Sequence, residues 1–134
     1  AFAKLTRARR YIEARLEDPD LSVDVICRDL GISRTKLYEL FDSFGGVSTY
    51  IRDRRLRQAF VALADKTRSH RSIYDIALDA GYSSDAAFVR AFRRRYGATP
   101  ADVRHAGYTQ KSPDHHDRPG LDRRHEDWVK HRMI

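Results

Sequence analysis

The feature that most limits the folds open to this chain is an internal repeat. Residues 23–41 read VDVICRDLGISRTKLYELF, and residues 73–92 read IYDIALDAGYSSDAAFVRAF. In each copy a short segment with helical spacing of apolar residues ends before a glycine, and a serine then precedes a second such segment. A short helix, a turn with glycine and a second helix form a helix-turn-helix unit. The chain therefore predicts two such units.

The other segments are also patterned for helices, and runs with the alternating pattern of strands are absent from the sequence. Leu5, Ala8, Ile12 and Leu16 have helical spacing, and Pro19 ends that segment. We predict an all-α fold of about seven helices, in which a long linker helix joins the two units. Residues with N-cap preference precede the later helices, with Pro100 after the last of them: Ser22, Ser33, Ser48, Ser72, Ser83 or Ser84, and Thr99.

These patterns divide the chain into four parts. Residues 1–47 form an N-terminal helix-turn-helix unit, 48–66 the linker helix, 67–107 a C-terminal helix-turn-helix unit and 108–134 a polar tail. Apolar residues at helical spacing within the tail allow one short helix, over about residues 121–132, in a segment that is otherwise disordered in composition. His115 and His116 suggest a metal site, but two adjacent histidines do not face one ion on a regular element, so we predict no metal site.

The charge of the chain indicates its partners. Lys and Arg number 26 against 19 acidic residues, a formal net charge of +7. Nucleic acid is the first candidate partner, and an anionic membrane surface is the second. No apolar run is long enough to span a bilayer, and no secretory signal is expected, so we predict no membrane partner. The single cysteine, Cys27, excludes an intramolecular disulfide and suits the cytoplasm; we read it as a small filler between helices.

An enzyme is disfavoured. Paired carboxylates, a nucleophile with a base, metal-ligand spacing and a phosphate-binding loop do not emerge from the sequence. We therefore predict neither a catalytic residue nor a cofactor.

The second repeat carries a family pattern of Ile-x-x-Ile-Ala, Gly-aromatic-Ser, Phe-x-x-x-Phe, a basic run, Gly-x-Thr-Pro and a final arginine. With these motifs the chain, over residues 5–106, resembles the DNA-binding domain of AraC/XylS-type transcription regulators. One departure is the connection between Phe41 and Tyr50, which is shorter than usual in the family. The matching residues are Ile73, Ile76, Ala77, Gly81, Tyr82, Ser83, Phe88, Phe92, Arg93, Arg94, Arg95, Gly97, Thr99, Pro100 and Arg104.

The resemblance implies a sequence-specific DNA-binding regulator of transcription, more often an activator, in the bacterial cytoplasm at the nucleoid. Double-stranded DNA is the implied partner, and RNA polymerase a further one. Family members usually carry a separate effector or dimerisation domain, which this chain does not show. A stand-alone monomeric regulator stays open, as does a sequence-neutral architectural DNA-binding protein. A protein-interaction surface can accompany either, with no residue assigned to it.

In the second helix of the C-terminal unit, Phe88, Phe92 and Tyr96 are spaced by four and are expected to face the core. The resemblance places Arg90 where it reaches base edges, and its guanidinium can pair there with guanine. Arg93, Arg94 and Arg95 are expected to contact backbone phosphates, although a basic run is more often a solvated surface. Asp85 either accepts from cytosine or sits at the positive helix end. The contacts predicted on this helix are Ser84, Asp85, Ala86, Arg90, Arg93 and Arg94.

In the N-terminal unit the resemblance makes Thr35, Tyr38 and Glu39 base readers. Arg34 and Lys36 read bases or hold phosphate, and Tyr38 has the alternative of a half-buried surface aromatic. Further candidate phosphate contacts are Ser33, Arg52 and Arg55.

The predicted linker helix sets a length. A helix of about 19 residues spans about 28 Å, whereas successive major-groove segments on one face of B-DNA lie about 34 Å apart. We therefore expect either a bend in the DNA or one unit that binds closely and another that binds loosely.

Overall fold

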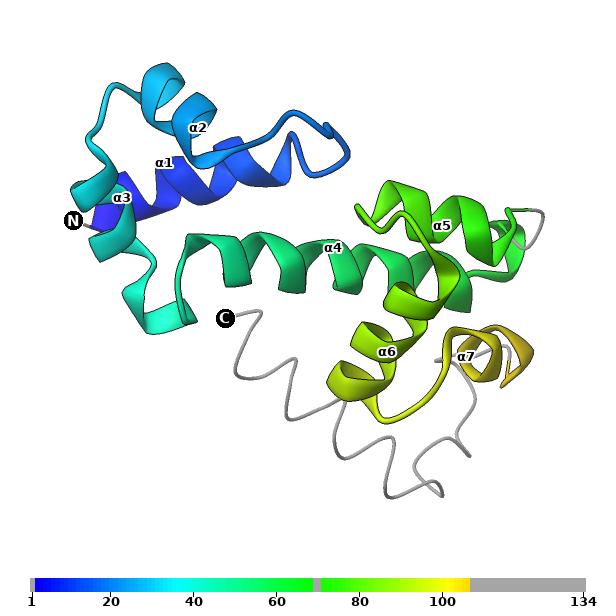
Figure 1. Ribbon diagram of the computed structural model, residues 1–134. Helices are drawn as coiled ribbons and strands as arrows, with labels where there is room; N and C mark the ends of the chain where they lie inside the picture. The colour runs from blue at the N-terminus through cyan, green and yellow to red at the C-terminus, as the bar shows by residue number, and fades with distance from the viewer. Residues whose placement is uncertain (1, 69–70, 107–134) are drawn as a thin grey trace. The chain divides into compact units, whose positions relative to one another are not determined.

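Seven α-helices and two 3-10 turns follow one another through residues 2–68 and 71–106, the ranges that the computed structural model describes (Figure 1). No strand occurs in these ranges, which confirms the predicted all-α fold with two helix-turn-helix units and a long helix between them. The elements are α1 (Phe2–Glu13), α2 (Val23–Leu30), α3 (Arg34–Leu40), η1 (Asp42–Phe44), α4 (Val47–Ala64), η2 (Lys66–Arg68), α5 (Ile73–Asp79), α6 (Asp85–Tyr96) and α7 (Pro100–Ala106).

The chain divides into two compact units within the long helix α4. Unit 1 is Ala1–Leu56 and contains α1, α2 and α3, and unit 2 is Arg57–Ile134 and contains α5, α6 and α7. The first part of α4 thus belongs to unit 1 and its last part to unit 2. The predicted tail, residues 108–134, lies outside the described residues.

Serine side chains start four of the helices, as their sequence positions predict. An N-cap hydroxyl satisfies a backbone N–H that has no partner within the first turn. Of the two candidates before α6, the structure selects Ser84. The serine Oγ atoms accept from backbone N–H groups three residues later: Ser22 from Val25 at 3.2 Å, Ser33 from Lys36 at 3.0 Å, Ser72 from Asp75 at 2.9 Å and Ser84 from Ala87 at 3.2 Å.

Three boundaries differ from the prediction. Helix α1 ends at Glu13, although Leu16 beyond it is still buried in the core of unit 1. Helix α4 ends at Ala64, before the predicted end at residue 66. It begins at Val47, so Ser48 lies inside the helix and is not its cap. The reason is local: Gly45 and Gly46 take positive φ values of 82° and 106°, a conformation that glycine adopts at little cost. The chain thereby reverses after η1 and enters the helix at once.

The two helix-turn-helix turns share one backbone contact but differ in length. In each unit the residue after the glycine donates its N–H to the carbonyl of a small residue four positions before that glycine. The second turn has one more residue between its glycine and its cap serine. The two contacts are Ile32 to Cys27 at 3.1 Å and Tyr82 to Ala77 at 3.0 Å.

Unit 1 joins an apolar core to a partly buried polar network. Phe41, Phe44 and Tyr50 pack with ring centroids 4.9–5.7 Å apart. Fully buried side chains from α1, the segment after it, α2 and α3 complete the core; they include Ile12, Leu16, Ile26 and Leu37.

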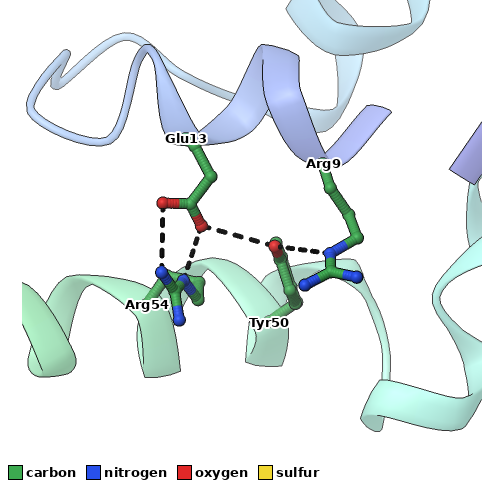
Figure 2. A network of polar contacts seen from close by, with 4 residues as sticks. All are labelled: Arg9, Glu13, Tyr50 and Arg54. Carbon is green, nitrogen blue, oxygen red and sulfur yellow. Dashed lines mark hydrogen bonds and ion pairs between the residues drawn. The ribbon is translucent and has the colours of Figure 1, made fainter. Parts of the chain in front are cut away.

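The polar network ties α1 to α4 inside unit 1 (Figure 2). Arg54 grips the carboxylate of Glu13 with two nitrogens, its Nε at 2.5 Å from Oε2 and its Nη2 at 3.2 Å from Oε1. The Tyr50 hydroxyl donates to Glu13 Oε2 at 3.4 Å and accepts from Arg9 Nε at 3.2 Å. Burial, and after it the charge of Glu13, raises the pKa of Tyr50, so its hydroxyl stays protonated as this network requires.

Unit 2 is held by a row of aromatic rings. Phe60 of α4 stacks on Phe92 of α6 at 6.0 Å and contacts Tyr96 at 4.8 Å. Phe88 continues the row at 5.6 Å from Phe92. Phe88, Phe92 and Tyr96 are at most 1% exposed, which confirms them as the inward face of α6. Val103 of α7 is equally buried and completes this core.

Candidate nucleic-acid interface

The exposed side of α6 carries the residues that the sequence predicts to touch DNA. Ser84, Asp85 and Ala86 are exposed at the start of the helix, and Arg90, Arg93 and Arg94 are exposed further along. The last four of these six residues share one side of the helix by their spacing. This side is opposed to the buried aromatic face, so the core fixes which residues α6 presents outward.

The guanidinium groups on this side are not engaged elsewhere in the described part of the chain. No hydrogen bond or ion pair joins the Arg90, Arg93 or Arg94 side chain to another described residue. Their charges are therefore exposed together on one helix face, next to a first turn in which Ala86 and Ala87 are small. Such a face can approach a polyanion closely.

Arg95 corrects the expectation that the whole basic run contacts phosphate. This residue is only partly exposed, and its Nε and Nη2 atoms are buried. Arg95 follows Phe92 by three residues and Phe88 by seven, a helical spacing that places it on the same side of α6 as these buried rings. Arg95 thus serves the structure of unit 2 and not the exposed basic side.

Helix α3 presents a more mixed surface. Leu37 is fully buried, whereas Thr35, Tyr38 and Glu39 are exposed, with Tyr38 at 47%. The Nζ atom of the half-buried Lys36 lies 3.9 Å from the Glu39 carboxylate. The structure therefore brings the predicted readers of α3 to one exposed stretch, but it pairs part of their charge within the helix.

Arg34, the first residue of α3, is held by two side chains. Its Nη1 donates to the Tyr38 hydroxyl at 3.1 Å, and its Nη2 forms an ion pair with Asp24 of α2. The hydrogen bond from Arg34 to Tyr38, and after it the charge of Asp24, raises the pKa of Arg34. Sequence reasoning did not single out Asp24. Its signal is its place in the repeat, where the second copy has Tyr74.

The α4 arginines separate into two groups. Arg52 is exposed, in keeping with the predicted phosphate contact. Arg55 is partly engaged within unit 1, because its Nε donates to the Leu16 carbonyl at 2.7 Å and its Nη2 to the Asp18 carbonyl at 3.1 Å; its phosphate contact stays a prediction. Arg54 binds Glu13 in the network of Figure 2. Arg54 and Arg55 therefore join α4 to residues of and after α1 in unit 1.

Residues 2–68 and 71–106 contain no group of three or more His, Cys, Asp or Glu side chains that could hold a metal ion. None of the helices described is both long and apolar enough to cross a membrane. Cys27 is a free thiol, half-buried against the core of unit 1. His115 and His116 lie outside the described residues.

Comparison with known proteins agrees with this geometry. The family profile described as "Helix-turn-helix domain" matches residues 26–106. The chain is 38% identical over 97 residues to regulatory protein SoxS of Escherichia coli, covering 71% of this chain and 87% of SoxS. It is 38% identical over 79 residues to the virulence regulon transcriptional activator VirF of Yersinia enterocolitica, covering 58% of this chain and 28% of VirF.

A solved structure shows the same fold. The crystal structure of an AraC-type DNA-binding-domain regulator from Chromobacterium violaceum has a TM-score of 0.70 and 34% sequence identity. The alignment covers 78% of this chain and 92% of that one. Family profile, sequence relatives and fold therefore indicate the same family. The chain belongs to the AraC/XylS-type family of helix-turn-helix transcription regulators and contains the DNA-binding domain of that family.

Proposed function

We propose that this chain regulates transcription by reading a DNA sequence with α3 and α6, each in a segment of the major groove. One observation carries the proposal: each unit has an N-capped second helix that is fixed by a buried core and presents a polar or basic side outward. An α-helix with that profile fits the major groove, where base edges can be distinguished.

On α6 the residues divide by their chemistry. The exposed fork of Arg90 suits the two acceptors of guanine, and Arg93 and Arg94 supply charge to phosphates on either side. Ala86 allows close approach and can place a methyl against thymine. The Ser84 hydroxyl, whose oxygen caps the helix, keeps its proton free to donate to a phosphate. Asp85 serves mainly the positive end of the helix.

On α3 we propose that Thr35, Tyr38 and Glu39 contact bases, with Lys36 near phosphate. Glu39 faces a strongly negative partner, so it contributes only where it accepts from the amino group of cytosine or stays paired with Lys36. Ser33 and Arg52 are proposed as phosphate contacts that set the position of unit 1 without reading sequence.

We further propose that the chain is an activator that also contacts RNA polymerase and acts in the cytoplasm at the chromosome. Its similarity to VirF, which is named an activator, supports this direction. The chain covers most of SoxS but about a quarter of VirF, so relatives with and without a large additional region exist. A separate effector or dimerisation domain for this protein is proposed only by analogy with the longer kind.

The decisive test is selection of bound sequences from a random DNA pool, with the same selection repeated for Arg90→Ala and for Arg10→Ala. Arg10 is an exposed arginine of α1 and serves as the matched control for lost charge. We expect the wild type to enrich a defined sequence, and Arg90→Ala to lose preference at one base pair by about tenfold. Arg10→Ala should keep the whole preference.

Two results would change the proposal. If the wild type enriches no sequence, the chain is a sequence-neutral architectural DNA-binding protein. If Arg90→Ala weakens binding to all sequences equally, Arg90 is a phosphate contact and not a reader.

The geometry of binding has its own test. The 18 residues of α4 span about 27 Å, less than the repeat of the major groove on one face of DNA. We therefore propose that binding bends the DNA. Circularly permuted fragments should show position-dependent gel mobility, and uniform mobility would favour close binding by one unit alone.

A further inference from the structure

The contact between Asp24 and Arg34 joins the two helices of the first helix-turn-helix unit across ten residues of sequence. The Arg34 side chain is 54% exposed and that of Asp24 is 76% exposed, so the pair lies on the surface. Tyr38, one turn further along α3, accepts from the other terminal nitrogen of the same guanidinium. An exposed arginine would ordinarily sample many rotamers, and two partners at different atoms restrict it to one orientation.

This arrangement does not serve the stability of α3. Arg34 occupies the first turn of the helix, where the backbone dipole disfavours a cation, and that turn contains no acidic residue. Ion pairs between exposed side chains also stabilise a fold very little. The two contacts are therefore better explained by the orientation that they impose on the Arg34 guanidinium than by a contribution to the stability of the fold.

The two partners leave useful donors on Arg34. Asp24 occupies one N–H of Nη2 and Tyr38 one N–H of Nη1, so the Nε–H and one N–H on each terminal nitrogen stay available. Two such donors are enough for the paired acceptors of guanine. The carboxylate of Asp24 meanwhile repels phosphate and offsets the charge that would draw Arg34 to the DNA backbone.

We propose that Asp24 is a positioning residue that determines specificity: together with the Tyr38 hydroxyl it orients Arg34 toward a base edge and away from phosphates. This inference rests on the proposed function, and it makes Arg34 a base reader. The device belongs to unit 1 alone, because the second repeat has Tyr74 and Asp85 at the positions of Asp24 and Arg34. Asp24 thus lowers the affinity of unit 1 for DNA of any sequence and raises its discrimination between sequences.

The test compares five proteins: wild type, Asp24→Asn, Tyr38→Phe, Arg34→Ala and the double variant Asp24→Asn with Arg34→Ala. Each is subjected to selection from a random DNA pool and to titration with a random duplex over a range of salt concentrations. Glu17→Gln is the charge control, because Glu17 is exposed in unit 1 and forms no ion pair with the described residues. Thermal unfolding followed by circular dichroism checks that each variant is folded.

We expect Arg34→Ala to reduce preference at one base pair about tenfold. Asp24→Asn should reduce preference at that same base pair about three- to tenfold, without changing it elsewhere. Tyr38→Phe should reduce it there by a similar factor and also change preference at the base pair that Tyr38 itself contacts. Asp24→Asn should also bind the random duplex more tightly than wild type. The double variant should have the same preference as Arg34→Ala, because replacing Asp24 has no further effect once the Arg34 side chain that it orients is gone.

The results separate this inference from the proposed function. A wild type without sequence preference overturns the proposed function and this inference with it. A wild type with a clear preference that Asp24→Asn leaves intact overturns the positioning role alone, as does an Arg34→Ala variant with unchanged preference. A loss of preference in Glu17→Gln as large as that in Asp24→Asn would reduce the effect to general electrostatics and overturn the inference as well.

Discussion

The two helix-turn-helix units are copies in sequence pattern, yet the helices of each unit are held together by different contacts. Unit 1 combines a small aromatic cluster with the polar network of Glu13, Tyr50 and Arg54. Unit 2 uses a row of aromatic rings on a longer helix, with its outward arginines free of partners among the described residues. The repeat therefore conserves the capped helix pair within this chain, while the means of fastening and the outward charge differ between its copies.

The difference extends to single equivalent positions. Arg34 of α3 corresponds to Asp85 of α6, and Glu39 corresponds to Arg90. If α3 and α6 contact bases as proposed, these opposite charges predict that the two units prefer different base pairs. An asymmetric binding site is the expected consequence.

The largest effect should come from the equivalent core phenylalanines. Phe41→Ala and Phe92→Ala each remove a ring that is fully buried, and each should lower the free energy of unfolding by about 3–5 kcal/mol. Phe92 should lie at the upper end, because Phe60, Phe88 and Tyr96 all pack against it. Urea unfolding of the two variants measures this directly. A Phe92→Ala cost below about 1 kcal/mol would contradict the assigned core.

A smaller loss of stability should distinguish the ion pair of Glu13 in unit 1 from that of Asp79 in unit 2. Glu13→Gln removes the charged partner of Arg54, whose side chain is only 15% exposed, and should destabilise unit 1 by about 1–2 kcal/mol. Asp79→Asn breaks the exposed pair with Arg71 in unit 2 and should cost less than about 1 kcal/mol. Thermal unfolding of both variants gives the comparison. Equal costs would mean that the network in Figure 2 is no more than a surface ion pair.

Arginines at different places should respond differently to salt. Arg93→Ala should reduce the slope of log affinity for DNA against log salt concentration by about 1, without loss of stability. Arg55→Ala should leave the slope unchanged and lower the unfolding temperature, because its guanidinium binds the carbonyls of Leu16 and Asp18. Duplex titrations at several salt concentrations, paired with melting curves, distinguish the two. A reduced slope for Arg55→Ala would identify it as a phosphate contact.

The smallest effect concerns acid. The Thr99 N–H donates to the Asp102 carboxylate at 3.2 Å, and the Asp102 N–H donates to Thr99 Oγ1 at 3.0 Å, a reciprocal cap of α7. The hydrogen bond from the Thr99 backbone N–H to the carboxylate lowers the pKa of Asp102 below its ordinary value. Its stabilisation is thus complete above the unfolded pKa of about 3.9 and is lost as the pH falls through the lower folded pKa.

Asp102→Asn tests this pH dependence. Unit 1 has no equivalent carboxylate at the third residue of α2 or α3, where Val25 and Lys36 stand. The variant should be slightly less stable than wild type at pH 7, and the difference should vanish in strong acid. Circular dichroism over a pH series would show it. A difference that persists unchanged below the folded pKa would rule out the capping carboxylate as its cause.

The sequence predicted what depends on neighbours along the chain. Cap serines such as Ser22 and Ser84 act on N–H groups three residues away, and the inward face of α6 follows from helical spacing, so both could be predicted. Arg55 and Arg54 could not, because their partners on and after α1 lie 37 to 41 residues away in sequence. Whether an arginine is exposed depends on such distant contacts. Asp24 was missed for a different reason, because its partner Arg34 lies ten residues away on the next helix, where helical spacing does not predict a contact.

The unequal turns of the two units have a consequence for how such a domain can change. Gly31 and Gly81 both carry a positive φ, and a side chain built on Gly31 would meet no atom within 4 Å, so backbone conformation and not space restricts that site. The added residue in the second turn leaves the serine cap of the next helix intact. The segment between the glycine and the cap serine can therefore accept an added residue. Such an insertion would change the position of the second helix while leaving its sequence and its cap unchanged.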